Sequence, residues 1–155
     1  MAKRSAGILL YRLRGGGIEV LLVHPGGPFW KAKDAGAWSI PKGEYDEGDD
    51  ALEAARREYA EELGIAPGIG AMLPLGEVKL ASGKIVMAWA LEGDCDAGAA
   101  RSNSFSMEWP PRSGKMQEFP EVDQAAWFSI AEAREKMHPA QGEFLDRLTS
   151  RVRKA

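Results

Sequence analysis

The segment from Gly43 to Ile65 constrains the fold more strongly than any other part of the chain. Apolar side chains recur in it every three or four residues, which is the spacing that lines one face of an α-helix. Those positions are Leu52, Ala55, Tyr59 and Leu63. Asp50 and Glu53 form a D-x-x-E pattern typical of a helix start, and Gly64 stands where a left-handed cap would end the helix. The segment therefore predicts an amphipathic helix that packs against the core.

The predicted helix carries a large excess of negative charge. The segment contains nine acidic residues and only two basic ones, Arg56 and Arg57, whereas the whole chain has a net charge of only −3. Glu58, Glu61 and Glu62 lie within roughly 100° of one another on a helical wheel, beside the apolar stripe. Because like charges on adjacent turns repel each other, this arrangement suits the binding of hard divalent cations. The simpler interpretation is the solvated face of a glutamate-rich helix.

The order of residues in the segment resembles the signature of the Nudix hydrolase family. That signature runs Gly, five residues, an acid, seven residues, Arg-Glu, an apolar residue, any residue, Glu-Glu, any residue, Gly and an apolar residue. The matching positions here are Gly43, Asp49, Arg57, Glu58, Tyr59, Glu61, Glu62, Gly64 and Ile65. Asp49 stands where the family usually has Glu, and Tyr59 where an aliphatic residue is commoner, but the Arg-Glu-x-x-Glu-Glu centre is complete.

The resemblance implies an α/β fold, the Nudix α/β/α sandwich with a mixed β-sheet between helices. It also implies hydrolysis of a phosphoanhydride bond with Mg²⁺ as the cofactor, for which Mn²⁺ can substitute. Glu58, Glu61 and Glu62 would hold the metal together with the carbonyl oxygen of Gly43. Arg57 would orient a glutamate by a charge-assisted hydrogen bond, so Arg57, Glu58 and Glu61 are expected to be catalytic residues.

A further acid is expected outside the signature, as is common in Nudix enzymes. In the diadenosine tetraphosphate hydrolases of this family a glutamate stands six residues before a strand tryptophan, and Glu121 and Trp127 reproduce that spacing. Glu121 is therefore expected to be a metal ligand or the base that orients the water, with Glu118 as the second choice. The alternative is that both acids are solvated loop residues.

Substrate contacts are expected from basic and aromatic residues. The segment 109–115 combines Trp109, a Pro-Pro pair, Arg112 and Lys115, a set able to clamp a nucleobase and a polyphosphate. Lys42 precedes the signature glycine and is placed to meet a phosphate, as in the Pro-Lys-Gly of many relatives. Weaker candidates are Lys31 and Lys33. The remaining tryptophans can instead be core or sheet residues, and both histidines, His24 and His138, are interpreted as structural.

Periodicity and turn residues predict alternating strands and helices. Strands are expected at 7–14, 18–24, 37–40, 77–80, 84–91, 105–109 and 125–128. Loops rich in Gly and Pro are expected at 25–36 and 67–74. Ser129 and Glu132 form a capping box for a helix that Pro139 ends, and a C-terminal amphipathic helix follows around Phe144 and Leu148.

Length and composition predict one domain, residues 1–155, of a cytoplasmic enzyme. Cys95 is the single cysteine, so no internal disulfide can form, as expected of a reducing compartment. The N-terminal apolar run is short for a signal sequence, and no stretch is long enough to cross a membrane. A pI near 5.5 argues against binding of duplex nucleic acid. A small nucleotide is the expected partner, and the protein is expected to be a monomer or a homodimer.

Two functions from different classes are compatible with the sequence. The first is a Mg²⁺-dependent pyrophosphohydrolase that cuts a nucleoside diphosphate linked to a moiety X. A dinucleoside polyphosphate is the leading substrate, followed by a nucleoside triphosphate and then ADP-ribose. The second is a Nudix-fold nucleotide-binding or regulatory module that no longer hydrolyses, although such modules tend to lose the signature acids that this chain keeps.

Overall fold

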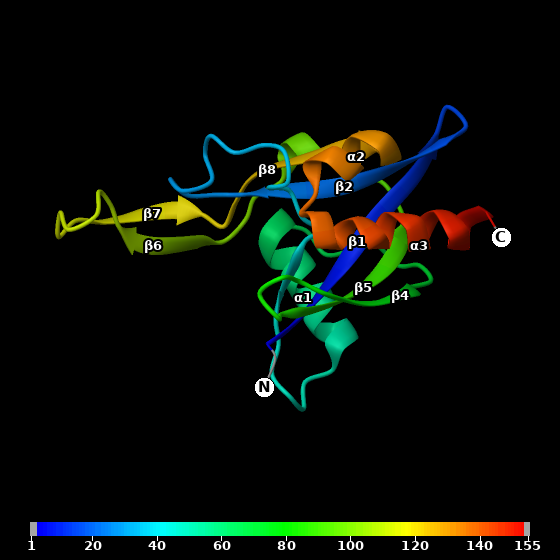
Figure 1. Cartoon of the computed structure of the whole chain (residues 1–155), viewed down its shortest axis with the longest axis horizontal. Helices are drawn as coiled ribbons and strands as arrows, with labels where there is room; N and C mark the ends of the chain where they lie inside the picture. Colours follow the sequence, from blue (N-terminus) through cyan, green and yellow to red (C-terminus); the bar gives the residue numbers. More distant parts are fainter. Residues whose placement is uncertain (1–2, 154–155) are drawn as a thin grey trace.

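A mixed β-sheet forms the centre of the protein in the computed structural model, which describes residues 3–153 (Figure 1). Its strands are β1 (Arg4–Arg14), β2 (Gly17–Pro25), β3 (Lys42–Glu44), β4 (Leu73–Lys79), β5 (Ile85–Glu92) and β8 (Val122–Ser129). The strand order is β4-β5-β1-β2-β8, and β3 pairs with β1. β1 and β5 run parallel, whereas the other neighbours in this sheet are antiparallel. The predicted mixed sheet is therefore confirmed.

Helices cover both faces of this sheet. They are α1 (Ala51–Leu63), α2 (Ile130–Lys136) and α3 (Gly142–Arg153), with short 3₁₀ turns η1 (Ala97–Ala99) and η2 (Pro139–Gln141). Successive residues of β1 point to opposite faces, so Ile8 packs in one buried cluster with Tyr59 of α1, and Leu9 packs in the other with Phe144 of α3. Figure 1 shows α3 lying across β1. These two apolar cores make the molecule an α/β/α sandwich.

The helix expected from the signature is α1, and its ends follow local sequence rules. The side chain of Asp50 accepts a hydrogen bond from the backbone N–H of Glu53 at 2.9 Å, which satisfies one free donor of the first turn. Gly64 adopts a left-handed φ of 79° and closes the helix. Tyr59 and Leu63 are buried, as the periodicity predicts, and this packing fixes which side of α1 faces the sheet.

The prediction of a strand at 37–40 is wrong, because this segment forms only isolated β-bridges. Ser39 pairs with Val23 of β2, and Trp38 pairs with Met137. The chain then crosses to β1, where Lys42–Glu44 forms β3. β1 and β2 pair directly only near the turn that joins them. Residues 37–40 lie where the two strands have separated, so they have no single partner strand along their length.

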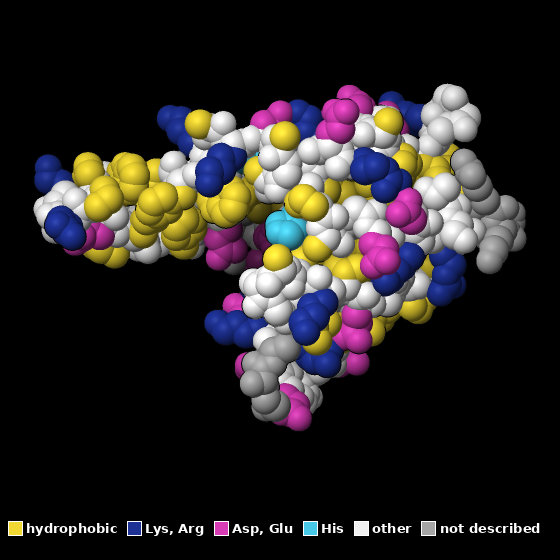
Figure 2. Space-filling model, in the orientation of Figure 1, with side chains coloured by type: hydrophobic (Ala, Val, Ile, Leu, Met, Phe, Trp, Pro, Cys, Tyr) yellow, Lys and Arg dark blue, Asp and Glu magenta, His cyan; other side chains and the backbone are white. Residues whose placement is uncertain are grey.

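Residues 104–120 form a separate hairpin that the sequence revealed only in part. β6 (Ser104–Glu108) agrees with the expected strand, except that Trp109 falls in the turn, whereas β7 (Met116–Pro120) was not predicted. The hairpin extends away from the main sheet in Figure 1, and Figure 2 shows apolar side chains along it. β4 likewise begins at Leu73, inside the loop expected at 67–74.

No helix in residues 3–153 is long and apolar enough to cross a membrane.

Candidate active site

The signature glutamates of α1 lie where that helix faces β3. Glu62 is only 9% exposed, and one of its carboxylate oxygens accepts the backbone N–H of Lys42 at 3.0 Å. Glu58 is half-buried, and its carboxyl group lies directly against Gly43. Arg57 reaches the same carboxyl group, with Nη2 3.7 Å from Oε1 of Glu58. The pairing of β3 with β1 therefore places Gly43, at the start of the signature, next to the glutamates of α1.

Glu121 is brought to this site by a chain of backbone hydrogen bonds. Asn103 donates its N–H to the carbonyl of Glu61 at 2.9 Å, which occupies a free acceptor in the last turn of α1. Glu121 in turn donates its N–H to the carbonyl of Asn103 at 2.8 Å. Glu118 is exposed in β7, opposite Ser106, and so lies further along the hairpin. Of the two acids, Glu121 is thus the one held beside the signature helix.

The acidic groups influence one another's protonation. Burial raises the pKa of Glu62 to about 8, although the neighbouring Lys42 partly offsets this effect. Burial also raises the pKa of Glu58 and of Glu121, and in both cases the nearby charge of Glu61 adds to the increase. The metal-free site therefore resists full ionisation, and a divalent cation would relieve this repulsion.

The donor set fits a hard cation such as Mg²⁺, since it consists of carboxylate oxygens and a backbone carbonyl. The oxygens do not form a ready-made cage, because no three Asp, Glu, His or Cys side chains within residues 3–153 converge as a cation site. Glu62 is instead turned toward the N–H of Lys42, and Glu58 toward Arg57.

A cleft of about 250 Å³ opens beside these acids. Glu62, Glu121 and Lys42 contribute to its wall, and Trp30 and His138 belong to the same lining. Burial and the nearby charge of Lys84 lower the pKa of Lys42, so its ammonium group would be stabilised by an anion. The cleft therefore combines acids suited to a metal with a cation suited to a phosphate.

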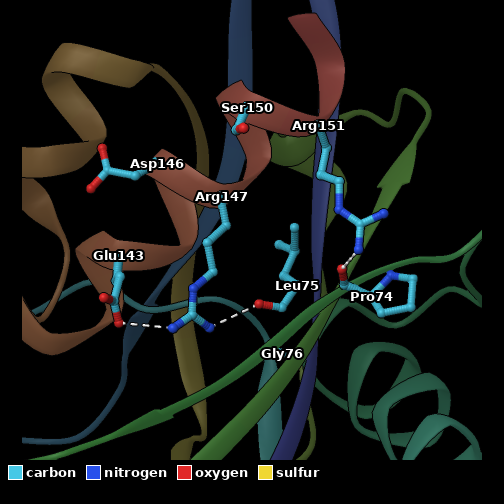
Figure 3. A pocket seen from close by; sticks show the side chains of 8 residues that line it. All are labelled: Pro74, Leu75, Gly76, Glu143, Asp146, Arg147, Ser150 and Arg151. Carbon is cyan, nitrogen blue, oxygen red and sulfur yellow. Dashed lines mark hydrogen bonds and ion pairs between the residues drawn. The ribbon is translucent and has the colours of Figure 1, made fainter. Parts of the chain in front are cut away.

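A larger groove of about 730 Å³ lies elsewhere, between α3 and β4 (Figure 3). The two arginines of this groove already form hydrogen bonds with backbone carbonyls of the protein. Arg147 donates to the carbonyls of Leu75 and Glu77, both at 2.9 Å, and Arg151 donates to the carbonyl of Pro74 at 2.9 Å. Because the guanidinium groups are used to hold α3 on β4, we assign the candidate site to the smaller cleft.

The other expected substrate contacts lie outside this cleft. Trp109, Arg112 and Lys115 lie in the turn of the β6–β7 hairpin and are absent from the cleft's described lining. Trp109 packs edge to face on Phe29, with ring centroids 5.4 Å apart. Lys31 and Lys33 line a separate depression next to His24. The structure thus brings Lys42 to the signature acids but leaves the hairpin residues apart from them.

The remaining tryptophans occupy different environments. Trp38 is 4% exposed and belongs to the core, and Trp89 and Trp127 are half-buried in β5 and β8. Trp30 is 41% exposed, so the alternative of a core position does not apply to it. It stands at the wall of the cleft instead.

His24 proves to have an acidic partner that no local spacing revealed. Its Nδ1 lies 2.8 Å from Oδ1 of Asp123 in β8, and its Nε2 lies 2.5 Å from the carbonyl oxygen of Lys33. These contacts tie the loop at 25–36 to the sheet. His24 thus holds the fold together, whereas His138, also interpreted as structural, lines the cleft.

Comparison with known proteins is consistent with this fold. The sequence profile described as the NUDIX domain matches residues 1–148. A crystal structure of a C. elegans Ap4A hydrolase binary complex is similar, with a TM-score of 0.67, 23% identity and coverage of 97% of this chain and 99% of that chain. The NUDIX domain of Shewanella oneidensis NrtR, complexed with ADP ribose, has a TM-score of 0.64, 15% identity and coverages of 98% and 89%. The MutT protein from Methanosarcina mazei Go1 has a TM-score of 0.60, 20% identity and coverages of 99% and 96%.

Proposed function

The chain belongs to the Nudix hydrolase family, and from this premise we propose that it is a Mg²⁺-dependent pyrophosphohydrolase acting on a nucleoside diphosphate linked to a moiety X. One observation carries the proposal. Glu62 and Glu121 line one cleft with Lys42, and Glu58 and Glu61 stand beside them on α1. Cleavage of a polyphosphate chain uses this combination, in which oxygen ligands hold a metal and a cationic side chain contacts a phosphate.

Each side chain has a proposed role in the reaction. Glu58, Glu61, Glu62 and the carbonyl of Gly43 would hold Mg²⁺, which supplies charge neutralisation and water activation when bound. Glu121 orients the attacking water and accepts its proton, or shares the metal. Its raised pKa suits a group that must take up a proton. Arg57 keeps Glu58 in place from the flank of α1, since their side chains form an ion pair.

Among substrates we propose a dinucleoside polyphosphate first, a nucleoside triphosphate second and ADP-ribose third. The similarity to an Ap4A hydrolase along nearly the whole of both chains supports the first member, and the ADP ribose bound by the NrtR domain supports the third. Lys42 would contact the phosphate chain within the cleft. Trp109, Arg112 and Lys115 would contact only the outer part of a long substrate, because they lie at the hairpin turn.

The proposal is tested by incubating the purified protein with dinucleoside polyphosphates, nucleoside triphosphates and ADP-sugars, with Mg²⁺ or with a chelator. Chromatography of the products would identify the bond that is cleaved. We expect Mg²⁺-dependent products from the wild type and turnover reduced by orders of magnitude in Glu62→Gln. The matched control is Glu53→Gln, an exposed acid in the first turn of the same helix, which should retain full activity.

The competing proposal is a nucleotide-binding module that does not hydrolyse. The same panel separates the two functions, since that module would bind nucleotides without releasing a phosphate-bearing product under any metal condition. Near-native activity of Glu62→Gln would instead preserve the hydrolase class and contradict the assignment of the metal ligands.

A further inference from the structure

His138 is held rigidly at the wall of the cleft. It follows α2 and forms the N-cap of η2, where its Nδ1 accepts the backbone N–H of Ala140 at 3.3 Å. Its own backbone N–H donates to the carbonyl of Trp38 at 2.9 Å. Trp38 is a core residue, so the position of His138 is set by the interior of the protein.

The contact with Ala140 determines which ring nitrogen of the neutral imidazole carries the proton. A backbone N–H can only donate, so Nδ1 must present its lone pair, and the proton of the neutral ring is then on Nε2. Within residues 3–153, Nδ1 is the ring nitrogen that forms a hydrogen bond, and Nε2 forms none. The ring therefore has an N–H donor that is not used within the protein, and His138 lines the same cleft as Glu62 and Lys42.

We propose that Nε2–H of His138 donates a hydrogen bond to an oxygen of the substrate's phosphate chain. This inference rests on the proposed function and adds a residue that neither the signature nor its spacing indicates. Lys42 supplies positive charge to the same cleft, and His138 supplies a directed, uncharged donor, so the two would make different kinds of contact with the chain. The role is to position the substrate, and the acids of α1 remain the groups that act on the bond.

Two substitutions separate this role from a purely structural one. His138→Asn retains an oxygen that can accept the N–H of Ala140, but it has no donor at the Nε2 position. His138→Gln retains an N–H near the Nε2 position, but it loses the acceptor that caps η2. The two variants therefore remove the two functions of the ring one at a time.

The measurements are KM and kcat for the best substrate, binding of inorganic tripolyphosphate by calorimetry with Mg²⁺, and Tm. We expect His138→Asn to raise KM and weaken tripolyphosphate binding by about tenfold, with kcat and Tm nearly unchanged. His138→Gln should bind tripolyphosphate almost as the wild type does, with a lower Tm. Binding of adenosine should be the same in all three proteins.

The opposite pattern would overturn the inference. If His138→Asn binds tripolyphosphate normally, or if binding in both variants declines together with Tm, His138 is structural. Weaker adenosine binding with normal tripolyphosphate binding would place the contact on the nucleoside and also refute the phosphate assignment. Tripolyphosphate binding requires no turnover, so a wild type that hydrolyses nothing would refute the proposed function separately.

Discussion

Glu58 occupies the space that a side chain at Gly43 would take. A Cβ atom added to Gly43 would lie 2.0 Å from Cδ of Glu58 and 2.2 Å from its Oε2. The two residues come from β3 and α1 and are brought together by the pairing of Gly43 with Ala6 of β1. The signature glycine is therefore needed here for the close approach of the acid to the backbone.

Gly43→Ala should displace the carboxyl group of Glu58 without unfolding the protein. The clash is with the end of a flexible side chain, which can rotate away, but it would then leave the metal site. We expect a loss of Mg²⁺-dependent turnover of at least tenfold with a nearly unchanged Tm. Gly68→Ala is the control, because no atom lies within 4 Å of the added Cβ and its activity should not change. Equal activity of the two variants would contradict the proposed position of Glu58.

Glu62→Gln should make the stability of the metal-free protein less dependent on pH. The pKa of Glu62 is about 8 in the folded state against an ordinary value of 4.5, so the folded state binds more protons between these pH values. The free energy of unfolding of the wild type therefore falls as pH rises through this window. The penalty at pH 8 is up to about 4 kcal/mol, and glutamine removes it.

Thermal denaturation in a chelator would measure this difference. The Tm of Glu62→Gln should exceed that of the wild type at pH 8, and the two should converge near pH 4.5, the ordinary pKa of the group. Adding Mg²⁺ at pH 8 should raise the Tm of the wild type more than that of the variant. A constant Tm difference at all pH values would show that burial of Glu62 does not carry this cost.

Glu121→Gln should reduce turnover far more than Glu118→Gln does. Glu121 is attached through Asn103 to the last turn of α1 and lines the cleft, whereas Glu118 lies further along the hairpin, opposite Ser106. We expect a reduction of about a hundredfold for Glu121→Gln, in the range found for loss of a general base, and at most a twofold change for Glu118→Gln. Steady-state kinetics at saturating Mg²⁺ would measure both. The reverse order would assign the further acid to Glu118.

Arg147→Ala should destabilise the protein without changing its activity. The Arg147 side chain donates to carbonyls on both sides of Gly76 and so attaches α3 to an irregular part of β4. Loss of these bonds should lower the free energy of unfolding by about 1–2 kcal/mol, as measured by urea denaturation. Arg134→Ala is the matched control, because its ion pair with Asp146 is exposed and should contribute less than about 0.5 kcal/mol. A large loss of activity in folded Arg147→Ala would give the groove of Figure 3 a functional role.

Elements whose signals are local were predicted well. The Asp50 cap, the apolar stripe and Gly64 delimit α1, and Ser129 and Glu132 form the expected capping box of α2. The errors lie where pairing decides the structure. The segment at 37–40 has the composition of a strand but finds no continuous partner, and β7 has mixed polarity but forms a strand because β6 lies beside it.

The sequence by itself determined the family signature, the helix that carries Glu58, Glu61 and Glu62, and the mixed α/β architecture. The helix follows from periodicity and caps, which depend on residues only a few positions apart, and the alternation of strands and helices follows from periodicity and turns. The signature follows from the spacing of its residues, and the sandwich was implied by the resemblance to the family. The tertiary structure alone decided that Glu121 joins Glu61 through Asn103, and that His138 faces the cleft of Glu62. Contacts of this kind depend on how distant segments pair and pack. The spacing of Glu121 and Trp127 indicated the acid, but not its attachment to α1.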